Sequence, residues 1–285
     1  MASSRVKLNQ RNEASNMKIT ILYFSPTGTT KKTLRIFGNK LAESLHTDPI
    51  QEMDLTPKKS REKKYCFSEN DLVVLGLPVY AGRVPNVLKE FIASIQGGGA
   101  KGVAITLFGN RSFDDALAEL MNQMKENGFQ VLGAGAFVGE HSFSRVLGKG
   151  RPLPEDLEEL EEFALAVAAK AQEDDPSTDF SVPGEFPCRP YYTPKNMEGE
   201  PVNFLKAKPV TSSACTDCKL CVELCPMDSI DYEDTSRVPG ICIKCSACVK
   251  FCPVGAKSFD DVGFLGHKQQ IETTFIEPKK NQWFI

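Results

Sequence analysis

Residues 18–30 of the sequence read KITILYFSPTGTT and join an apolar run directly to a loop of hydroxyl residues. The run 18–24 is rich in β-branched and aromatic residues, which predicts a buried strand. Apolar residues recur at helical spacing from the loop to His46, so the loop stands at the start of a predicted helix. A strand, a hydroxyl loop and a helix N-terminus favour phosphate binding, because backbone N–H groups and the helix dipole attract an anion.

The candidate phosphate loop lacks two better-known nucleotide patterns. It has neither the glycine triplet of a dinucleotide site nor a Gly-Lys-Thr step, so we expect a phosphomonoester. A simpler alternative stays open, because Ser and Thr before a helix often serve only as N-caps. The candidate ligands are Ser25, Thr27, Gly28, Thr29 and Thr30.

Two further buried strands are predicted at 71–76 and 102–107, and each leads into a loop with glycine and an aromatic or hydroxyl residue. In an open parallel sheet, such loops meet at the topological switch point, so the three loops are expected to converge on one ligand. The periodicity also predicts three helices: one at 86–94, one that follows residues 108–115 and ends at about Met124, and one at 155–172. A further strand is predicted at 131–138.

Eight of the ten cysteines lie within residues 215–252, in two runs of the form C-x-x-C-x-x-C-x-x-x-C-P. Three cysteines spaced by two residues let one loop ligate three irons of a 4Fe-4S cluster, and the fourth cysteine of each run ligates the other cluster. The first set is then Cys215, Cys218, Cys221 and Cys252, and the second set is Cys225, Cys242, Cys245 and Cys248.

Structural zinc and disulfides are the alternatives for these eight cysteines. Zinc prefers two well-separated ligand pairs, and a chain without an export signal is a poor candidate for disulfides. Cys66 and Cys188 fall outside both runs and have no partner at metal-ligand spacing. We interpret these two as buried or unreactive thiols.

The composition predicts a folded protein of about two domains, since 285 residues include 41% hydrophobic and 25% charged residues. A net charge of -3 argues against nucleic-acid binding through phosphate neutralisation. The apolar stretches are too short to cross a bilayer, and residues 1–16 contain no apolar segment of signal-peptide type. We therefore expect a cytoplasmic protein that binds neither nucleic acid nor membrane.

The three loops are similar to those of the flavodoxin family. The resemblance implies a doubly wound α/β fold with a parallel five-stranded sheet of order 2-1-3-4-5, and FMN as the ligand. The first loop would hold the FMN phosphate, and the next two would enclose the ring. For Tyr80 and Phe113, core packing is the alternative. His141 is the only histidine expected near the flavin, and a surface or structural role is favoured for it. The residues implied at the ring are Pro78, Val79, Tyr80, Ala81, Gly82, Arg83, Gly109, Asn110, Phe113 and Asp114.

Residues 209–260 resemble a bacterial-type two-cluster ferredoxin, a small α+β domain. The whole chain is similar to flavodoxin-ferredoxin fusion proteins of anaerobic bacteria and archaea. We expect residues 1–16 to be disordered and residues 17–173 to form the FMN-binding domain. The proline-rich linker 174–208 is expected to pack along one or both domains. The tail 261–285 is expected to dock back onto the protein, with partner binding as the alternative.

The resemblance implies FMN and two 4Fe-4S clusters in one electron carrier. Each cluster passes one electron and FMN takes one or two, so the chain would couple one-electron and two-electron carriers. One alternative is an FMN-dependent reductase of a small substrate, with the ferredoxin domain as internal electron supply. Another is an interaction protein whose clusters are sensors or structural elements. No catalytic residue is assigned.

The expected partners are redox proteins, namely a low-potential donor and a flavin-dependent or ferredoxin-dependent acceptor. Acidic residues outnumber basic ones between residues 210 and 260, and clusters with their thiolates add negative charge. A partner should therefore present a basic patch to the ferredoxin domain.

Overall fold

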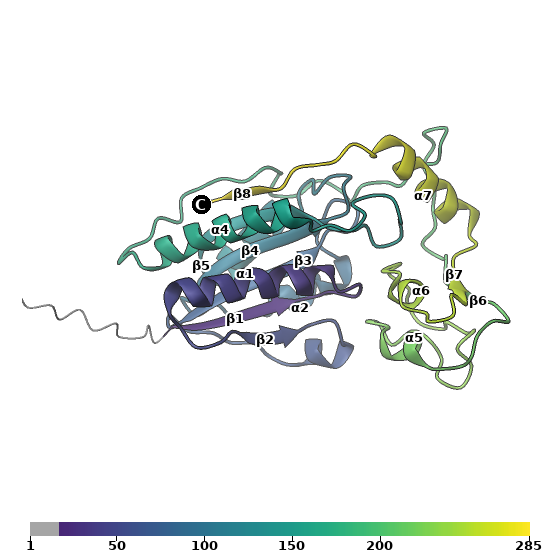
Figure 1. Cartoon of the computed structure of the whole chain (residues 1–285), viewed down its shortest axis with the longest axis horizontal. Helices are drawn as coiled ribbons and strands as arrows, with labels where there is room; N and C mark the ends of the chain where they lie inside the picture. Colours follow the sequence, from purple (N-terminus) through teal and green to yellow (C-terminus); the bar gives the residue numbers. More distant parts are fainter. Residues whose placement is uncertain (1–16) are drawn as a thin grey trace, which may run out of the picture.

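The structure, a computed structural model, describes residues 17–285, and the predicted disorder of residues 1–16 lies outside the described residues. A six-stranded sheet of order β2-β1-β3-β4-β5-β8 dominates the fold (Figure 1). Its first five strands run parallel, and β8 is antiparallel to β5. The predicted flavodoxin-like order 2-1-3-4-5 is therefore confirmed, with one further strand at the edge. The strands are β1 (Lys18–Tyr23), β2 (Gln51–Asp54), β3 (Asp71–Pro78), β4 (Lys101–Phe108), β5 (Gln130–Val138) and β8 (Gln282–Phe284).

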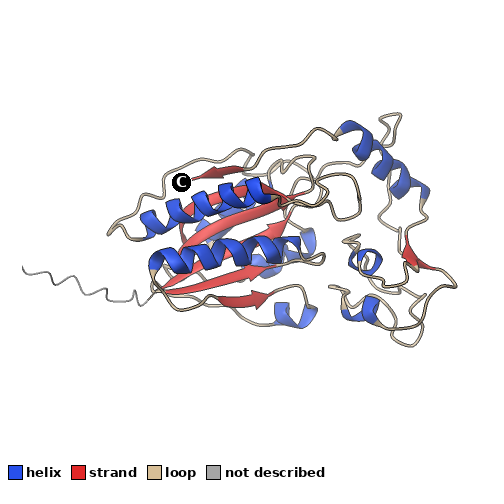
Figure 2. Ribbon diagram, viewed as in Figure 1, coloured by secondary structure: helices blue, strands red, loops and turns tan. Residues whose placement is uncertain are grey.

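Helices cover both faces of the sheet (Figure 2). One face carries α1 (Thr29–Leu45) and α4 (Pro154–Ala171). The other carries α3 (Ala116–Glu126), the 3-10 turn η2 (Asn86–Leu88) and the short α2 (Lys89–Ala93). None of the helices within residues 17–285 is long and apolar enough to cross a membrane.

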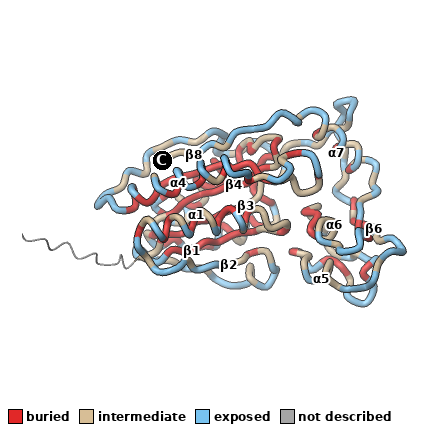
Figure 3. Tube along the Cα trace, viewed as in Figure 1, coloured by how far each residue is buried: buried red, intermediate tan, exposed pale blue. Residues whose placement is uncertain are grey.

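Each face of the sheet has its own apolar core, and β3, β4 and β5 are buried almost end to end (Figure 3). Burial on both faces explains why these strands are continuous hydrophobic runs in the sequence. Phe137 and Phe163 are fully buried, and each such side chain contributes roughly 1.5–3 kcal/mol.

Two elements differ from the periodicity of the sequence. Strand β2 has the polar sequence QEMD and is half exposed on the sheet, so no apolar pattern marked it. The helix predicted at 86–94 is instead a 3-10 turn followed by the five-residue α2. Its last turn ends where the Asn127 amide donates a hydrogen bond to the Ile92 carbonyl oxygen at 2.7 Å.

The C-terminal segment docks back onto the sheet, which was the first of the two alternatives. It forms α7 (Val262–Thr274) and then β8, whose Trp283 stacks on Phe163 with ring centroids 5.5 Å apart. Just before β8, Asn281 Oδ1 accepts a hydrogen bond from the Val138 N–H at 2.8 Å. Trp283 of β8 thus packs against the same apolar core as Ile19 and Ile21 of β1.

The cysteine-rich region forms a small unit at the end of the sheet to which the parallel strands point (Figure 1). It contains α5 (Leu220–Glu223), α6 (Ala247–Lys250) and an antiparallel pair of short strands, β6 (Val210–Thr211) and β7 (Lys257–Ser258). Another 3-10 turn, η1 (Lys58–Glu62), lies in the connection between β2 and β3. The cysteine-rich unit has the small α+β form that the resemblance to ferredoxins implies.

The proline-rich segment 174–208 packs on both parts of the chain. Phe180 lies near the ammonium groups of Lys125 and Lys170, at 5.5 and 5.0 Å from its ring centroid. Farther along, Phe204 stacks on His267 of α7 with ring centroids 5.6 Å apart. Cation–π and ring-stacking contacts of this kind explain why the segment carries so many aromatic residues.

Asp115 is a main anchor of this segment. Its buried carboxylate accepts hydrogen bonds from the backbone N–H groups of Glu185 and Arg189, at 3.0 and 2.9 Å. The Arg189 guanidinium also donates to it. These bonds, with that of the Arg189 side chain the largest effect, hold the pKa of Asp115 at about 2.

We expect Asp115→Asn to lower the free energy of unfolding by about 1–3 kcal/mol, because buried donors lose a charged acceptor. The variant should also expose residues 174–208 to faster proteolysis. Asp174→Asn, at the exposed start of the same segment, is the control.

The same substitution should alter the pH dependence of stability. The folded pKa lies below the ordinary value of 3.8, so the stabilisation is complete above that value and is lost as the pH falls toward 2. Urea unfolding should show the difference between wild type and Asp115→Asn narrowing from about pH 5 to about pH 3. A difference that stays constant over this range would contradict the assignment.

Candidate functional site

The loop between β1 and α1 places its hydroxyl groups at the N-terminus of a 17-residue helix. Gly28 is the N-cap with φ of 85°, a left-handed conformation that glycine adopts without strain. Ser25 Oγ accepts a hydrogen bond from the Lys31 N–H at 3.0 Å, and the Ser25 N–H donates to Thr56 Oγ1 at 2.8 Å. Ser25 Oγ thus satisfies one N–H group of the first turn of α1, although the N-cap residue is Gly28, and Ser25 also lines the space beside the loop.

A hollow opens beside this loop, where β1, β3, β4 and β5 end. Residues of all three predicted loops line it, together with the loop after β5, residues 139–142. Of that last loop only His141 was a candidate from the sequence, although the loop's position after a parallel strand indicated that it would lie at the same site. The predicted residues that line the hollow are Ser25, Thr27, Thr29, Thr30, Pro78, Val79, Tyr80 and Gly109.

The donors of this hollow fit a phosphomonoester such as FMN. Hydroxyl groups and the first backbone N–H groups of α1 are suited to phosphate oxygens, and the helix dipole adds positive potential there. The loops also approach closely, since a Cβ at Gly139 would lie 2.7 Å from Thr29 Cγ2. Tyr80, half-buried on the opposite wall, offers a flat aromatic face.

The other predicted residues of the second loop have structural contacts. Ala81 and Gly82 have φ of 50° and 78°, in a tight turn closed by two backbone hydrogen bonds between Tyr80 and Arg83, of 2.9 and 3.2 Å. Arg83 forms a buried ion pair with Glu119 at 2.6 Å. These three residues do not line the hollow, whereas Tyr80 does.

The predicted residues of the third loop, apart from Gly109, also have other partners. The Asn110 amide donates to the carbonyl oxygens of Phe275 and Glu277, at 2.7 and 3.0 Å. Phe113 packs in the apolar core, which was the alternative for it, and Asp114 forms an ion pair within its own loop. Asn110 thus holds the C-terminal segment, Phe113 belongs to the apolar core, and Asp114 stabilises its own loop.

His141 lies in the hollow but is held as a neutral ring. Its Nδ1 is 3.4 Å from the Phe143 nitrogen and 3.3 Å from the Ser144 nitrogen, and both N–H groups donate to it. Burial, assisted by the nearby Lys250 charge, lowers the pKa of His141 to about 3. A ring that accepts two backbone hydrogen bonds and does not titrate near neutral pH has the structural role that the sequence favoured.

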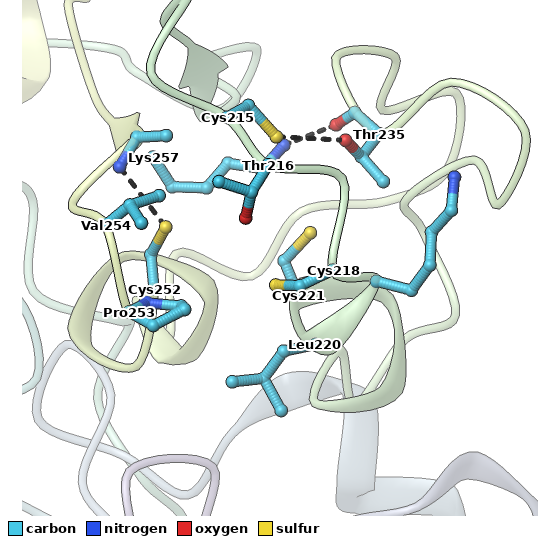
Figure 4. Close-up of a pocket in the computed structure, with 12 residues that line it drawn as sticks. Cys215, Thr216, Cys218, Leu220, Cys221, Thr235, Cys252, Pro253, Val254 and Lys257 are labelled. Atoms are coloured by element: carbon cyan, nitrogen blue, oxygen red, sulfur yellow. Dashed lines mark hydrogen bonds between the residues drawn. The ribbon is translucent and has the colours of Figure 1, made fainter.

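The eight clustered cysteines surround two separate hollows. Cys215, Cys218, Cys221 and Cys252, the first set, line one of them, and Figure 4 shows their sulfur atoms around one space. Cys225, Cys242, Cys245 and Cys248, the second set, line the other. In each hollow the fourth cysteine comes from the opposite run.

Each cysteine loop curls because two of its residues are left-handed. Asp217 and Lys219 have φ of 55° and 60°, and Lys244 and Ser246 have 56° and 60° at the same places in the second run. A left-handed residue reverses the local direction of the chain, so three successive cysteines can face one centre.

Backbone N–H groups point at the sulfur atoms of the fourth cysteines in the same way. Ser229 donates to Cys225 Sγ at 3.4 Å, and Ala256 donates to Cys252 Sγ at 3.2 Å. Such donors stabilise a thiolate, the form that binds metal. Burial raises the pKa of Cys248 to about 12, and the thiolate is the form in which a cysteine binds metal.

The arrangement fits a polynuclear cluster better than a single ion. Each set gathers four thiols around a hollow of its own. A structural zinc site brings four ligands to within about 2.3 Å of one ion, whereas a cubane binds each thiolate at a different iron. Ser246 Oγ, buried at the second hollow without a hydrogen-bond partner in the described chain, is a further donor suited to a cluster sulfur.

Direct contacts join the second set to the flavodoxin-like part. Lys250, two residues beyond Cys248, donates to Glu140 Oε1 at 2.5 Å and to the His141 carbonyl oxygen at 2.9 Å. On the other side, Arg61 of η1 donates to the carbonyl oxygen of Pro226 at 2.5 Å. The loop 139–142, which lines the hollow beside α1, is therefore hydrogen-bonded to the segment that follows Cys248 of the second set.

Tyr80 lies at the same boundary. Burial raises the pKa of its hydroxyl well above the usual value, and the thiols of Cys245 and Cys242 add to this effect. Ile243, between these two cysteines, packs against the apolar core of the sheet. The second set is thus the one close to the hollow of the flavodoxin-like part.

The two remaining cysteines line neither of the two cysteine-lined hollows. Cys66 is exposed, with its Sγ 3.4 Å from Gln96 Oε1. Cys188 is half-buried, and burial raises the pKa of its thiol, which makes it less reactive.

The chain was compared with protein families, curated proteins and solved structures. The family described as 4Fe-4S binding domain matches residues 212–228 and 239–255. No curated protein matches the chain. Among solved structures, a flavodoxin from the domain Archaea is 16% identical with a TM-score of 0.40, covering 55% of this chain and 100% of its own.

Two other solved structures match the same part. Flavodoxin 2 from Bacillus cereus is 21% identical with a TM-score of 0.38, covering 54% of this chain and 99% of its own. Rubredoxin oxygen:oxidoreductase from Desulfovibrio gigas is 20% identical with a TM-score of 0.38, covering 54% of this chain and 36% of its own. The strand order, rather than these scores, identifies the flavodoxin-like fold.

Thr30→Ala should weaken FMN binding about tenfold to a hundredfold, because one hydrogen bond to a charged group contributes about 1.5–3 kcal/mol. Flavin fluorescence titration measures the dissociation constant. Thr33→Ala is the matched control, since Thr33 donates to the Thr29 carbonyl oxygen within α1 and does not line the hollow. An unchanged dissociation constant for Thr30→Ala would remove the phosphate cradle.

Cys225→Ala should disturb the cluster of the second set and leave that of the first set intact. Iron analysis and electron paramagnetic resonance of the reduced protein measure this, and Cys252→Ala should give the reciprocal result. Cys66→Ala is the control for loss of a thiol. Loss of the first-set signal in Cys225→Ala would show that each run ligates its own cluster.

Proposed function

We propose that this chain, in which a flavodoxin-like domain is joined to a 4Fe-4S binding domain, transfers electrons between FMN and two 4Fe-4S clusters. One observation carries the proposal: Lys250, between the last two cysteines of its run, bonds to the loop 139–142 that lines the candidate FMN hollow. Electron transfer needs centres held close together, and this contact fixes the two kinds of site relative to each other.

The residues that would hold FMN are those around the hollow. Ser25, Thr27, Thr29 and Thr30, with the N–H groups at the start of α1, would bind the phosphate, and Tyr80 would flank the ring. FMN exchanges one or two electrons and each cluster exchanges one, so the assembly would couple one-electron to two-electron carriers.

The contacts also suggest an order for the centres. The second set lies near Tyr80 and the loop 139–142, so its cluster would exchange electrons with the flavin. The first set, whose Cys218 is exposed, would then meet the external redox partner. Exposed carboxylates of Asp217, Glu233 and Asp234 flank that side, which favours a partner with a basic patch. The cytoplasm, a reducing compartment, would keep the ten unpaired cysteines available.

A second candidate is an FMN-dependent reductase of a small anionic substrate. A recess between the two parts of the chain favours it, because Ser142 lines both this recess and the FMN hollow. Arg145 and Lys268 provide positive charge there, and Phe143 provides an apolar wall. Substrate-dependent oxidation of the reduced protein would distinguish this activity from simple electron carriage.

Anaerobic reductive titration of the purified protein tests the proposal. We expect about four electrons per chain, two for flavin and one for each cluster. Thr30→Ala protein prepared without flavin is the control and should take up about two. Uptake of about two electrons by wild-type protein, without a flavin signal, would reject the coupling of flavin and clusters.

A further inference from the structure

Lys257 is a buried cation at the base of the cysteine-rich unit. It lies in β7, five residues after Cys252, and is 3% exposed. Its side chain lines the hollow of the first set, together with the four cysteines of that set. Lysine is almost never buried to this degree unless its charge is paired.

The hydrogen-bond partners of Lys257 are all neutral. Its Nζ donates to Thr211 Oγ1 at 2.7 Å and to the carbonyl oxygen of Thr235. Within residues 17–285, no carboxylate pairs with its ammonium group, and every interaction of this residue is accounted for. The protein thus buries a full positive charge and supplies only dipoles to compensate it.

A 4Fe-4S cluster with four cysteine thiolates is an anion, and it gains one more negative charge on reduction. A buried cation next to it would be paired in both oxidation states, and more strongly in the reduced one. The charge of Lys257 opposes the effect of burial on the pKa of Cys221, in the first set, and of Cys248, in the second. Lys257 is therefore close to both sets.

The internal repeat provides a comparison within the same chain. Ile230 follows Cys225 by five residues, as Lys257 follows Cys252, and Ile230 lines the hollow of the second set. The two halves are alike in their left-handed residues and in the N–H groups that point at the fourth cysteines. At this position they differ, because one hollow is lined by a buried ammonium and the other by a buried alkyl group.

We infer that Lys257 is the buried counter-charge of the first-set cluster and raises its reduction potential above that of the second-set cluster. A nearby cation stabilises the reduced, more negative state more than the oxidised one, so the potential rises. Ile230 brings no charge to the second-set hollow, and Lys257 lines the first-set hollow but not the second-set one, so its charge acts more strongly on the first-set cluster. The inference rests on the iron-sulfur part of the proposed function and not on flavin binding.

Redox titration of the intact protein, followed by electron paramagnetic resonance, tests the inference. Lys257→Gln keeps a hydrogen-bond donor for Thr211 and Thr235 but removes the charge. In this variant the first-set potential should fall enough to change the ratio of reduced to oxidised cluster about tenfold, or about 59 mV for one electron. The second-set potential should move less. Performing the comparison in a Cys225→Ala background assigns the shifted signal to the first set.

Lys219→Gln is the matched control, because Lys219 also lines the first hollow but pairs with Asp217 at 2.8 Å at the surface. Its loss should have a smaller effect, since solvent screens an exposed pair. Equal shifts in the two variants, or unmoved potentials in Lys257→Gln, would overturn the inference and leave Lys257 as a hydrogen-bonding strut.

If Lys257→Gln fails to load its clusters, Lys257→Met and Lys257→Arg show whether the missing charge or the altered packing is the cause. Loading by Lys257→Arg, but not by Lys257→Gln or Lys257→Met, would support the need for a positive charge. Loss of clusters in all three would overturn the inference in favour of packing. Absence of any iron-sulfur signal in wild-type protein would instead reject the proposed function itself.

Discussion

Because β1, β3, β4 and β5 run parallel, the loops that follow them all leave the sheet at one edge, the one formed by the carboxyl ends of these strands. At that edge lie the hydroxyl loop at α1, the turn at Tyr80 and the loop 139–142, and the cysteine-rich unit packs there as well (Figure 1). A reversed strand among these four would carry its loop to the opposite end of the sheet. The direction of the strands thus decides which residues can share a ligand.

Charge compensation holds the two parts of the chain together at this edge. Lys250 is largely buried and has a carboxylate partner, Glu140, in the other part. Lys257, buried deeper, has only neutral partners within the described residues. A buried cation needs a compensating charge, which Glu140 supplies to Lys250 and which an anionic cluster in the first-set hollow would supply to Lys257.

The cysteine-rich unit is also tied at both of its ends. Before it, the proline-rich segment is fixed to the sheet domain through Asp115 and Arg189. After it, α7 and β8 return to the sheet, and the Asn110 amide bonds to the connection between them. Two attachments restrict the unit far more than one flexible linker would, so the distance between the two kinds of site depends on the fold and not on diffusion of a tethered domain.

The sequence by itself determined the features that depend on near neighbours along the chain. Apolar runs located β1, β3, β4 and β5, and cysteine spacing assigned two sets of thiols that the structure gathers around two hollows. It did not locate β2 or β8, because an edge strand is stabilised by pairing with a distant strand and needs no apolar pattern of its own. The resemblance implied that Asn110 and Arg83 would bind a flavin, and their contacts with Phe275 and Glu119 could not be predicted because these partners are far away in sequence. Only the tertiary structure decided such contacts, since hydrogen bonds and buried charges are set by what folding brings together.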